Sequence, residues 1–290
     1  MSIIAILASK FTSITGFNNI ALAFAFSPTL EGLIAYVKML AVRLEASVVF
    51  IHVGVPLPEQ MKIFANLLEK HSYRNQDYKM VFREGEVQSV IWDICEEENV
   101  NILVSGALRK ESPERQYFGS IARGLAGNPR GPIMLIPEPS LPAKKIETII
   151  TILPEDNPVQ MIETGMFFAK QTDCQLLYFV KESIFKADPT TLEEYNDNEG
   201  FSDASLMIID LEYDQIRQML KPYQNGGLNI HTKVVFGLPG SGIVSFAKEI
   251  GADLIIDALP HSGRDQDIFG APGNTEVILM NLPCNYLLFN

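Results

Sequence analysis

The chain has few of the residues that bind metals or form disulfides. Its 290 residues include three cysteines, four histidines and one tryptophan. Cys95, Cys174 and Cys284 lie far apart, and no CxxC or Cys/His metal spacing occurs. Separated thiols of this kind are typical of reduced, cytoplasmic proteins without structural zinc. We therefore expect a cytoplasmic protein with no metal site.

Positive charge is also scarce, because 23 Lys and Arg stand against 35 Asp and Glu, for a net charge of −12. Such a surface repels nucleic-acid phosphates and anionic lipid headgroups. No apolar run reaches the roughly 18 residues of a membrane-spanning helix. The apolar start, Met1–Ala8, lacks a basic n-region, so we interpret it as an extra strand or arm rather than a signal peptide. We expect no nucleic-acid binding and no membrane insertion.

Familiar catalytic motifs are missing as well. The sequence has no Gly-x-Ser-x-Gly elbow and no His-Glu-x-x-His, and its histidines fall on different predicted elements. Gly237–Gly242 resembles a phosphate loop, but Ile243 and Val244 stand where Lys and Ser or Thr are needed. We predict a strand-to-helix turn there, and we assign no catalytic residues.

The sequence does contain one α/β pattern twice. Short apolar runs of strand length alternate with amphipathic helical stretches, which indicates mostly parallel sheets covered by helices on both faces. The predicted fold class is α/β, with two tandem flavodoxin-like or Rossmann-like domains of five strands each. The predicted strands are Ile20–Ala25, Val48–Val53, Tyr78–Arg83, Asn101–Ser105, Ile133–Ile136, Ile149–Ile152, Leu176–Val180, Leu254–Ala258 and Tyr286–Phe289.

The proline-bearing segment Glu138–Pro142 separates the repeats, so we place the domains at residues 1–141 and 142–290. Aligning the repeats predicts a 25-residue insertion between the second and third strands of domain 2. The insertion falls in the acidic stretch Ser183–Asp214, which holds nine Asp or Glu and one Lys. Two interpretations stay open: a solvated or partly disordered loop leading into a helix, or a docking site for a basic partner.

The best candidate site lies in domain 1, in the glycine-spaced segment Gly106, Arg109, Gly119, Ser120 and Ile121. A strand, a flexible loop and a helix N-terminus together expose backbone N–H groups that can hold an anion. Nearby Lys110, Arg115 and Arg123 add positive charge. A strand-ending glycine and an ordinary helix cap explain the same residues without a ligand.

These residues carry a resemblance to a known family. The family pattern Gly-x2-Gly-x9-Gly-Ser/Thr has its four positions at Gly106, Arg109, Gly119 and Ser120, and Pro132–Ile136 resembles the proline-led final strand. The chain thus resembles a tandem universal stress protein, two such domains fused in one polypeptide. The resemblance implies that domain 1 binds ATP or a related nucleotide.

The chain departs from the family at several positions. The acidic residue that contacts adenosine after the first strand is replaced by Ala25 and, in our alignment, by Ile152 in domain 2. In domain 2, Ala258 and His261 occupy the glycine positions, and Ala271–Gly273 replaces Gly-Ser with a segment containing proline. We therefore expect no nucleotide in domain 2.

The resemblance also implies an assembly. The final strands of such domains pair antiparallel, which here would bring Ile133–Ile136 against Tyr286–Phe289 within one molecule as a pseudo-dimer. A further homodimer is in keeping with the family.

The leading functional hypothesis is a non-catalytic stress-response protein that works by binding. Domain 1 would bind ATP or another phosphate-containing ligand, and domain 2 would be structural or bind a partner. Two alternatives stay open: a regulatory or scaffold module for a partner protein or transporter without nucleotide, and a weak adenylate hydrolase or transferase.

Overall fold

The computed structural model describes residues 16–107, 109–112, 115–118, 120–183, 203–223, 227–236, 238–259 and 274–289. The side chains of residues 109–112, 115–118, 120 and 203–209 lie outside this description. The predicted arm at Met1–Ala8 and most of the predicted insertion, residues 184–202, also lie outside the described residues.

The first half alternates strands with helices, as the apolar pattern predicts. Its elements are β1 (Asn19–Ala23), α2 (Leu30–Leu44), β2 (Ser47–Val53), α3 (Pro58–Lys70), β3 (Tyr78–Arg83), α4 (Val87–Glu97), β4 (Ile102–Gly106), β5 (Arg109–Ser112), β6 (Arg115–Phe118), α5 (Ser120–Gly127) and β7 (Ile133–Ile136).

The second half repeats this order with one longer crossover. Its elements are β8 (Thr148–Ile152), α6 (Pro158–Gln171), β9 (Leu176–Ser183), α7 (Asp203–Leu220), a short 3₁₀ turn (Lys221–Tyr223), β10 (Ile230–Phe236), α8 (Ser241–Ile250), β11 (Leu254–Ala258), α9 (Asn274–Asn281) and β12 (Asn285–Phe289).

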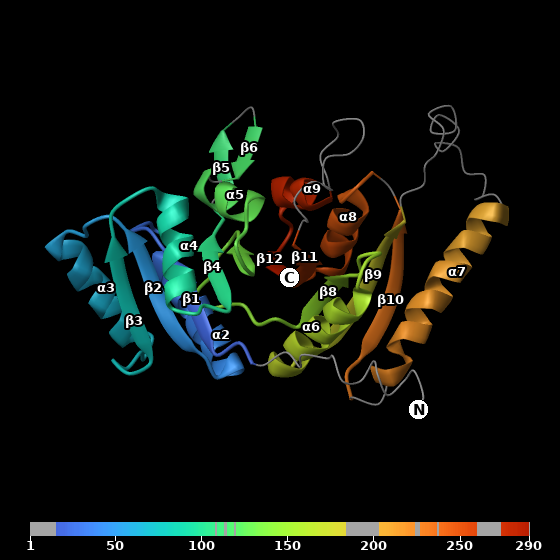
Figure 1. Cartoon of the computed structure of the whole chain (residues 1–290), viewed down its shortest axis with the longest axis horizontal. Coiled ribbons are helices and arrows are strands. Elements are labelled where there is room, and N and C mark those ends of the chain that lie inside the picture. The colour runs from blue at the N-terminus through green and yellow to red at the C-terminus, as the bar shows by residue number, and fades with distance from the viewer. Residues whose placement is uncertain are drawn as a thin grey trace.

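Ten strands form one continuous sheet in the order β10-β9-β8-β11-β12-β7-β4-β1-β2-β3 (Figure 1). Each half therefore has the 3-2-1-4-5 order of a Rossmann half rather than the 2-1-3-4-5 order of flavodoxin. Neighbouring strands are parallel except at the centre, where β7 and β12 run antiparallel with Leu135 opposite Tyr286. This pairing confirms the predicted contact between the final strands.

Helices cover both faces of the sheet, which explains why the strands are nearly continuous apolar runs. One core packs α2, α3, α6 and α7 on one face, and the other packs α4, α5, α8 and α9 on the opposite face. Every residue of β7 and β8 is buried. Each fully buried large apolar side chain contributes about 1.5–3 kcal/mol to folding.

Side chains also join the two halves across the central seam. The Phe17 ring lies 5.1 Å from the rings of Phe167 and Phe168. Asn285 Nδ2 donates to the Tyr36 hydroxyl at 3.1 Å. The seam is therefore a packed interior as well as a backbone ladder.

The sheet register corrects the predicted insertion. The first strands are offset by 129 residues, from Ile20 to Ile149, and the fourth strands by 152, from Ile102 to Leu254. The insertion is thus 152 − 129 = 23 residues, and the predicted 25 is wrong by two. The prediction ended the second strand at Val180, whereas β9 continues to Ser183.

Candidate functional site

The strand order places a topological switch point at the carboxyl ends of the first and fourth strands of each half. Crossovers leave these two neighbouring strands toward opposite faces, and ligands of open α/β sheets bind at such switch points. In the first half, Ala23 of β1 pairs with Ser105 of β4 at this edge. The predicted site residues follow directly after Ser105.

The structure places the five predicted site residues on three consecutive elements. Gly106 is the last residue of β4, Arg109 begins β5, and Ser120 and Ile121 begin α5. Ile121 is 44% exposed. Gly119 lies outside the described residues, as do the side chains of Arg109 and Ser120.

The predicted flexible loop between Gly106 and Gly119 is wrong in part. β5 and β6 form an antiparallel pair, with Arg109 opposite Phe118 and Ser112 opposite Arg115. Charged and polar residues follow one another there without alternating with apolar ones, so the strand signal is weak. The candidate loop therefore includes a β-hairpin, and β6 ends one residue before Gly119.

Gly106 has a packing role that the spacing did not reveal. A Cβ built at Gly106 would lie 3.0 Å from Leu33 Cδ1 of α2. Leu33 is buried and covers this side of the glycine. Gly106 thus lets α2 approach β4 closely, which is sufficient reason for a glycine there.

The first turn of α5 is electrostatically suited to an anion. It contains no acidic residue, and Arg123 is its fourth residue. Unsatisfied N–H groups and the helix dipole make such an end positive. The corresponding helix of the second half, α9, carries Glu276 in its first turn.

A buried acid lies near the carboxyl end of the fourth strand of the second half. Asp257 on β11 corresponds to Ser105 on β4 and is only 8% exposed. Tyr286 Oη donates to Asp257 Oδ2 at 2.6 Å, and the Ala258 N–H donates to Oδ1 at 2.8 Å. A carboxyl group in this position disfavours a phosphate, in agreement with the prediction of no nucleotide there.

Ala258 lies at the end of β11, in the position of Gly106, as the alignment predicted. His261 and residues 271–273 lie outside the described residues. The predicted equivalence of Ala25 and Ile152 is wrong by two residues. The N–H of Phe24 donates to Ile51 O and that of Leu153 to Val180 O, so Pro154 corresponds to Ala25.

Aromatic side chains fill the space beside β1 on the α2 and α3 face. Phe24 stacks on Phe64 with ring centroids 4.6 Å apart, and Phe26 lies 5.0 Å from the His52 ring. His52 Nδ1–H donates to Phe24 O at 3.0 Å, so His52 is a hydrogen-bonded residue of the sheet. This face holds a packed core in place of a pocket for a flat base.

Sequence reasoning missed one site residue, Glu182 at the end of β9. The turn between β10 and α8 is present as predicted, and its Gly240 N–H donates to Glu182 Oε2 at 3.0 Å. Burial raises the pKa of Glu182, while the N–H groups of Gly240 and Gly242 oppose the rise. The second half thus fills this helix N-terminus with its own carboxyl group.

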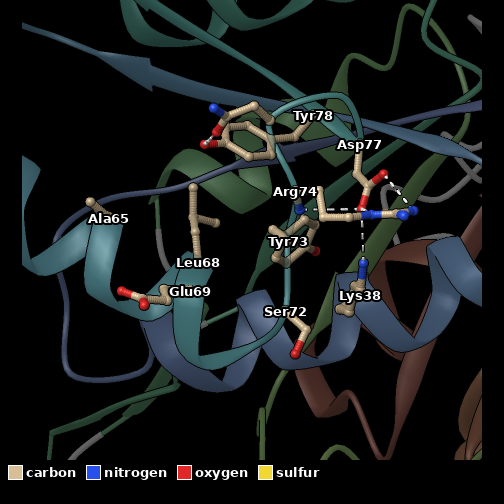
Figure 2. Close-up of a pocket in the computed structure, with 10 residues that line it drawn as sticks. Lys38, Ala65, Leu68, Glu69, Ser72, Tyr73, Arg74, Asp77 and Tyr78 are labelled. Atoms are coloured by element: carbon tan, nitrogen blue, oxygen red, sulfur yellow. Dashed lines mark hydrogen bonds and ion pairs between the residues drawn. The ribbon is translucent and has the colours of Figure 1, made fainter.

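A surface cavity lies in the first half, at the opposite edge of the sheet from the predicted site. It measures about 670 Å³ and is formed by residues of α2, α3 and the loop before β3 (Figure 2). Lys38 Nζ lies 3.5 Å from Asp77 Oδ2 and 4.6 Å from the centre of the Tyr73 ring. Arg74 pairs with Asp77 as well. No predicted site residue lines this cavity, and its main charges pair with one another.

Within the described residues, no cluster of His, Cys, Asp and Glu could hold a metal ion. None of the described helices is long and apolar enough to cross a membrane.

No protein-family model matches the sequence, and no curated protein matches it. Solved structures match over almost the whole length. A universal stress protein from Archaeoglobus fulgidus DSM 4304 superimposes with a TM-score of 0.69, covering 97% of this chain and 99% of its own at 15% identity. A protein of unknown function from Pseudomonas aeruginosa PAO1 follows with a TM-score of 0.67, 94% and 92% coverage and 13% identity. The chain has the α/β fold of tandem universal stress proteins.

Proposed function

We propose that this chain is a tandem universal stress protein of the cytoplasm that acts by binding rather than by catalysis. The first half binds ATP or another phosphate-containing ligand, and the second half is structural or binds a partner. The observation that carries this proposal is the contrast between α5 and α9. The α5 N-terminus has no acid in its first turn, whereas α9 has Glu276 in its first turn and the preceding strand β11 has the buried Asp257.

Backbone groups would hold the phosphate. The N–H groups of Ser120 and Ile121 stand at the start of α5, where an α-helix leaves its first donors without intrahelical partners. Arg123 adds a positive charge in the same turn. Such a site depends on the backbone, so it tolerates the change from glycine to Arg109.

The aromatic core next to β1 limits how much the base of a bound nucleotide can contribute to its binding affinity. Phe24, Phe26 and Phe64 already occupy the α2 and α3 face of the switch point. Recognition therefore rests on the phosphates, and we expect ATP and GTP to bind with similar affinity.

Isothermal titration with ATP tests the proposal through a matched pair of variants. Ser120→Asp places a carboxylate at the start of α5 and should weaken ATP binding by about tenfold or more through charge repulsion. Asn274→Asp makes the corresponding change at the start of the equally long α9 and should leave the affinity unchanged. Equal affinities for Ser120→Asp and the natural protein would refute the assignment.

The filled aromatic face favours one alternative, a scaffold or regulatory module that holds no nucleotide. Natural protein that ignores ATP, GTP and inorganic phosphate in the same titrations would support it. Slow adenylate turnover is a separate alternative. Sustained phosphate release that disappears in Ser120→Asp would replace the binding-only account.

A further inference from the structure

We propose that the second half positions the ligand loop of the first. Helix α9 supports strand β6, and the turn that Glu182 anchors before α8 supports α9. This inference deepens the proposed function, on which its ligand-binding readout rests. It assigns the second half a positioning role for the α5 site, through an interaction surface between the halves.

The first link is the contact between α9 and β6. These elements belong to different halves, yet their backbones lie side by side, with Cα atoms within 8 Å of one another. Figure 1 shows the β5–β6 hairpin rising beside α5, with α9 across the seam. β6 ends at Phe118 and α5 begins at Ser120, so the position of β6 restricts where α5 can begin. The start of α5 is therefore held from the second half.

The second link joins α9 to the turn before α8. Gly240 has φ of 73°, and a Cβ built there would lie 2.6 Å from Asn274 O and 2.9 Å from Val277 Cβ. Only glycine fits between this turn and the first turn of α9. The close approach leaves α9 little freedom to move toward the turn.

The third link anchors the turn to the sheet. Glu182 Oε2 accepts the Gly240 N–H, and Ser241 Oγ donates to Leu238 O at 2.6 Å within the turn. Glu182 extends from β9, whose neighbours β8 and β10 hold it on both sides. A continuous set of contacts thus runs from the sheet of the second half to the hairpin of the first.

Two alanine variants at opposite ends of α8 test this inference. Gly240→Ala introduces a Cβ against the backbone of α9, which cannot rotate away. Gly251→Ala has the same backbone strain, with φ of 64°, but nothing lies within 4 Å of the added Cβ. Both variants should lower the melting temperature through this strain, and Gly240→Ala should lower it further because of the clash, so only the contact with α9 distinguishes them.

The first readout is hydrogen exchange of the hairpin peptide, residues 109–118, in the full chain without ligand. We expect early deuterium uptake to rise several-fold in Gly240→Ala, and to stay at the natural level in Gly251→Ala. A peptide from α4, residues 87–97, should be unchanged in both. Glu182→Ala removes the anchor without a clash, and should raise hairpin uptake even if Gly240→Ala does not fold.

The second readout is ATP affinity by titration, which should fall about fivefold or more in Gly240→Ala and remain unchanged in Gly251→Ala. Equal hairpin uptake in both variants would overturn the inference, whatever ATP does. Raised uptake in Gly240→Ala with no ATP binding to the natural protein would refute the proposed function and leave the structural link intact.

Discussion

The two halves of this chain build the same sheet and close its carboxyl edge differently. In the first half, α4 is capped by the adjacent Glu86, which accepts the Gln88 and Ser89 N–H groups. In the second half, the corresponding helix α8 receives Glu182 from β9. Both of these helix starts are satisfied internally, although the carboxyl group comes from different places.

The difference that bears on function is one helix further along. α5 begins without an acid, whereas α9 has Glu276 in its first turn and Asp257 buried at the switch point. The repeated backbone thus offers two equivalent positions for an anion, and acidic side chains make the position in the second half unfavourable. The two halves therefore share a fold but differ in the charged side chains that would determine ligand binding.

The comparison treats the aromatic cluster of the first half as packed core, and it would fail if this cluster were a ligand pocket. We expect Phe64→Ala to lower the free energy of unfolding by about 3–5 kcal/mol, because Phe64 is 1% exposed and packs on Phe24 and Phe50. Urea denaturation measures this. The neighbouring Ile63→Ala, at a position 56% exposed, should change stability by no more than about 0.5 kcal/mol. A tolerated Phe64→Ala that gains nucleotide binding would show a pocket instead.

For the second half, the comparison depends on the hydrogen bond between Asp257 and Tyr286. Tyr286→Phe removes the donor 2.6 Å from a buried carboxyl oxygen and should cost about 1–3 kcal/mol of stability. Tyr178→Phe is the control, since the Tyr178 hydroxyl makes no hydrogen bond within the described part of the chain and should cost less than about 0.5 kcal/mol. Similar losses in both variants would mean that Asp257 does not depend on Tyr286.

The smallest expected effect is a pH dependence of stability, which comes from Glu182 beside the start of α8. Burial raises the pKa of Glu182 in the folded chain above its ordinary 4.5. A raised carboxyl pKa contributes stability that is fully present below 4.5 and is lost as pH rises through the folded-state value. The stability of the natural protein relative to Glu182→Gln should therefore fall with rising pH, by about 1 kcal/mol or less for this partly exposed group. Urea denaturation of both proteins from pH 4 to 8 checks this sign. A stability of the natural protein that rises with pH, relative to that of Glu182→Gln, would contradict the prediction.

Much of the fold follows from local patterns in the sequence. β3, β7 and β11 have the predicted bounds, and in the fully buried β7 the reason is that a strand covered on both faces consists of apolar residues. The antiparallel pairing of β7 and β12 came from family resemblance, because nothing local in either strand specifies a partner 150 residues away.

The errors have physical causes in particular residues. The hairpin at Arg109–Phe118 was missed because its charged residues lack the alternation of a half-buried strand. Glu182 was missed because the second strand was ended at Val180, so that a carboxyl group within β9 was assigned to no predicted element. Leu33 covering Gly106 could not be predicted, since it depends on how closely α2 approaches β4.

Native mass spectrometry of the intact chain with added ATP tests the central claim most directly. We predict one nucleotide per chain, lost in Ser120→Asp and retained in Asn274→Asp. Two nucleotides per chain, or a single one lost only in Asn274→Asp, would contradict an account in which the first half alone keeps an open anion site.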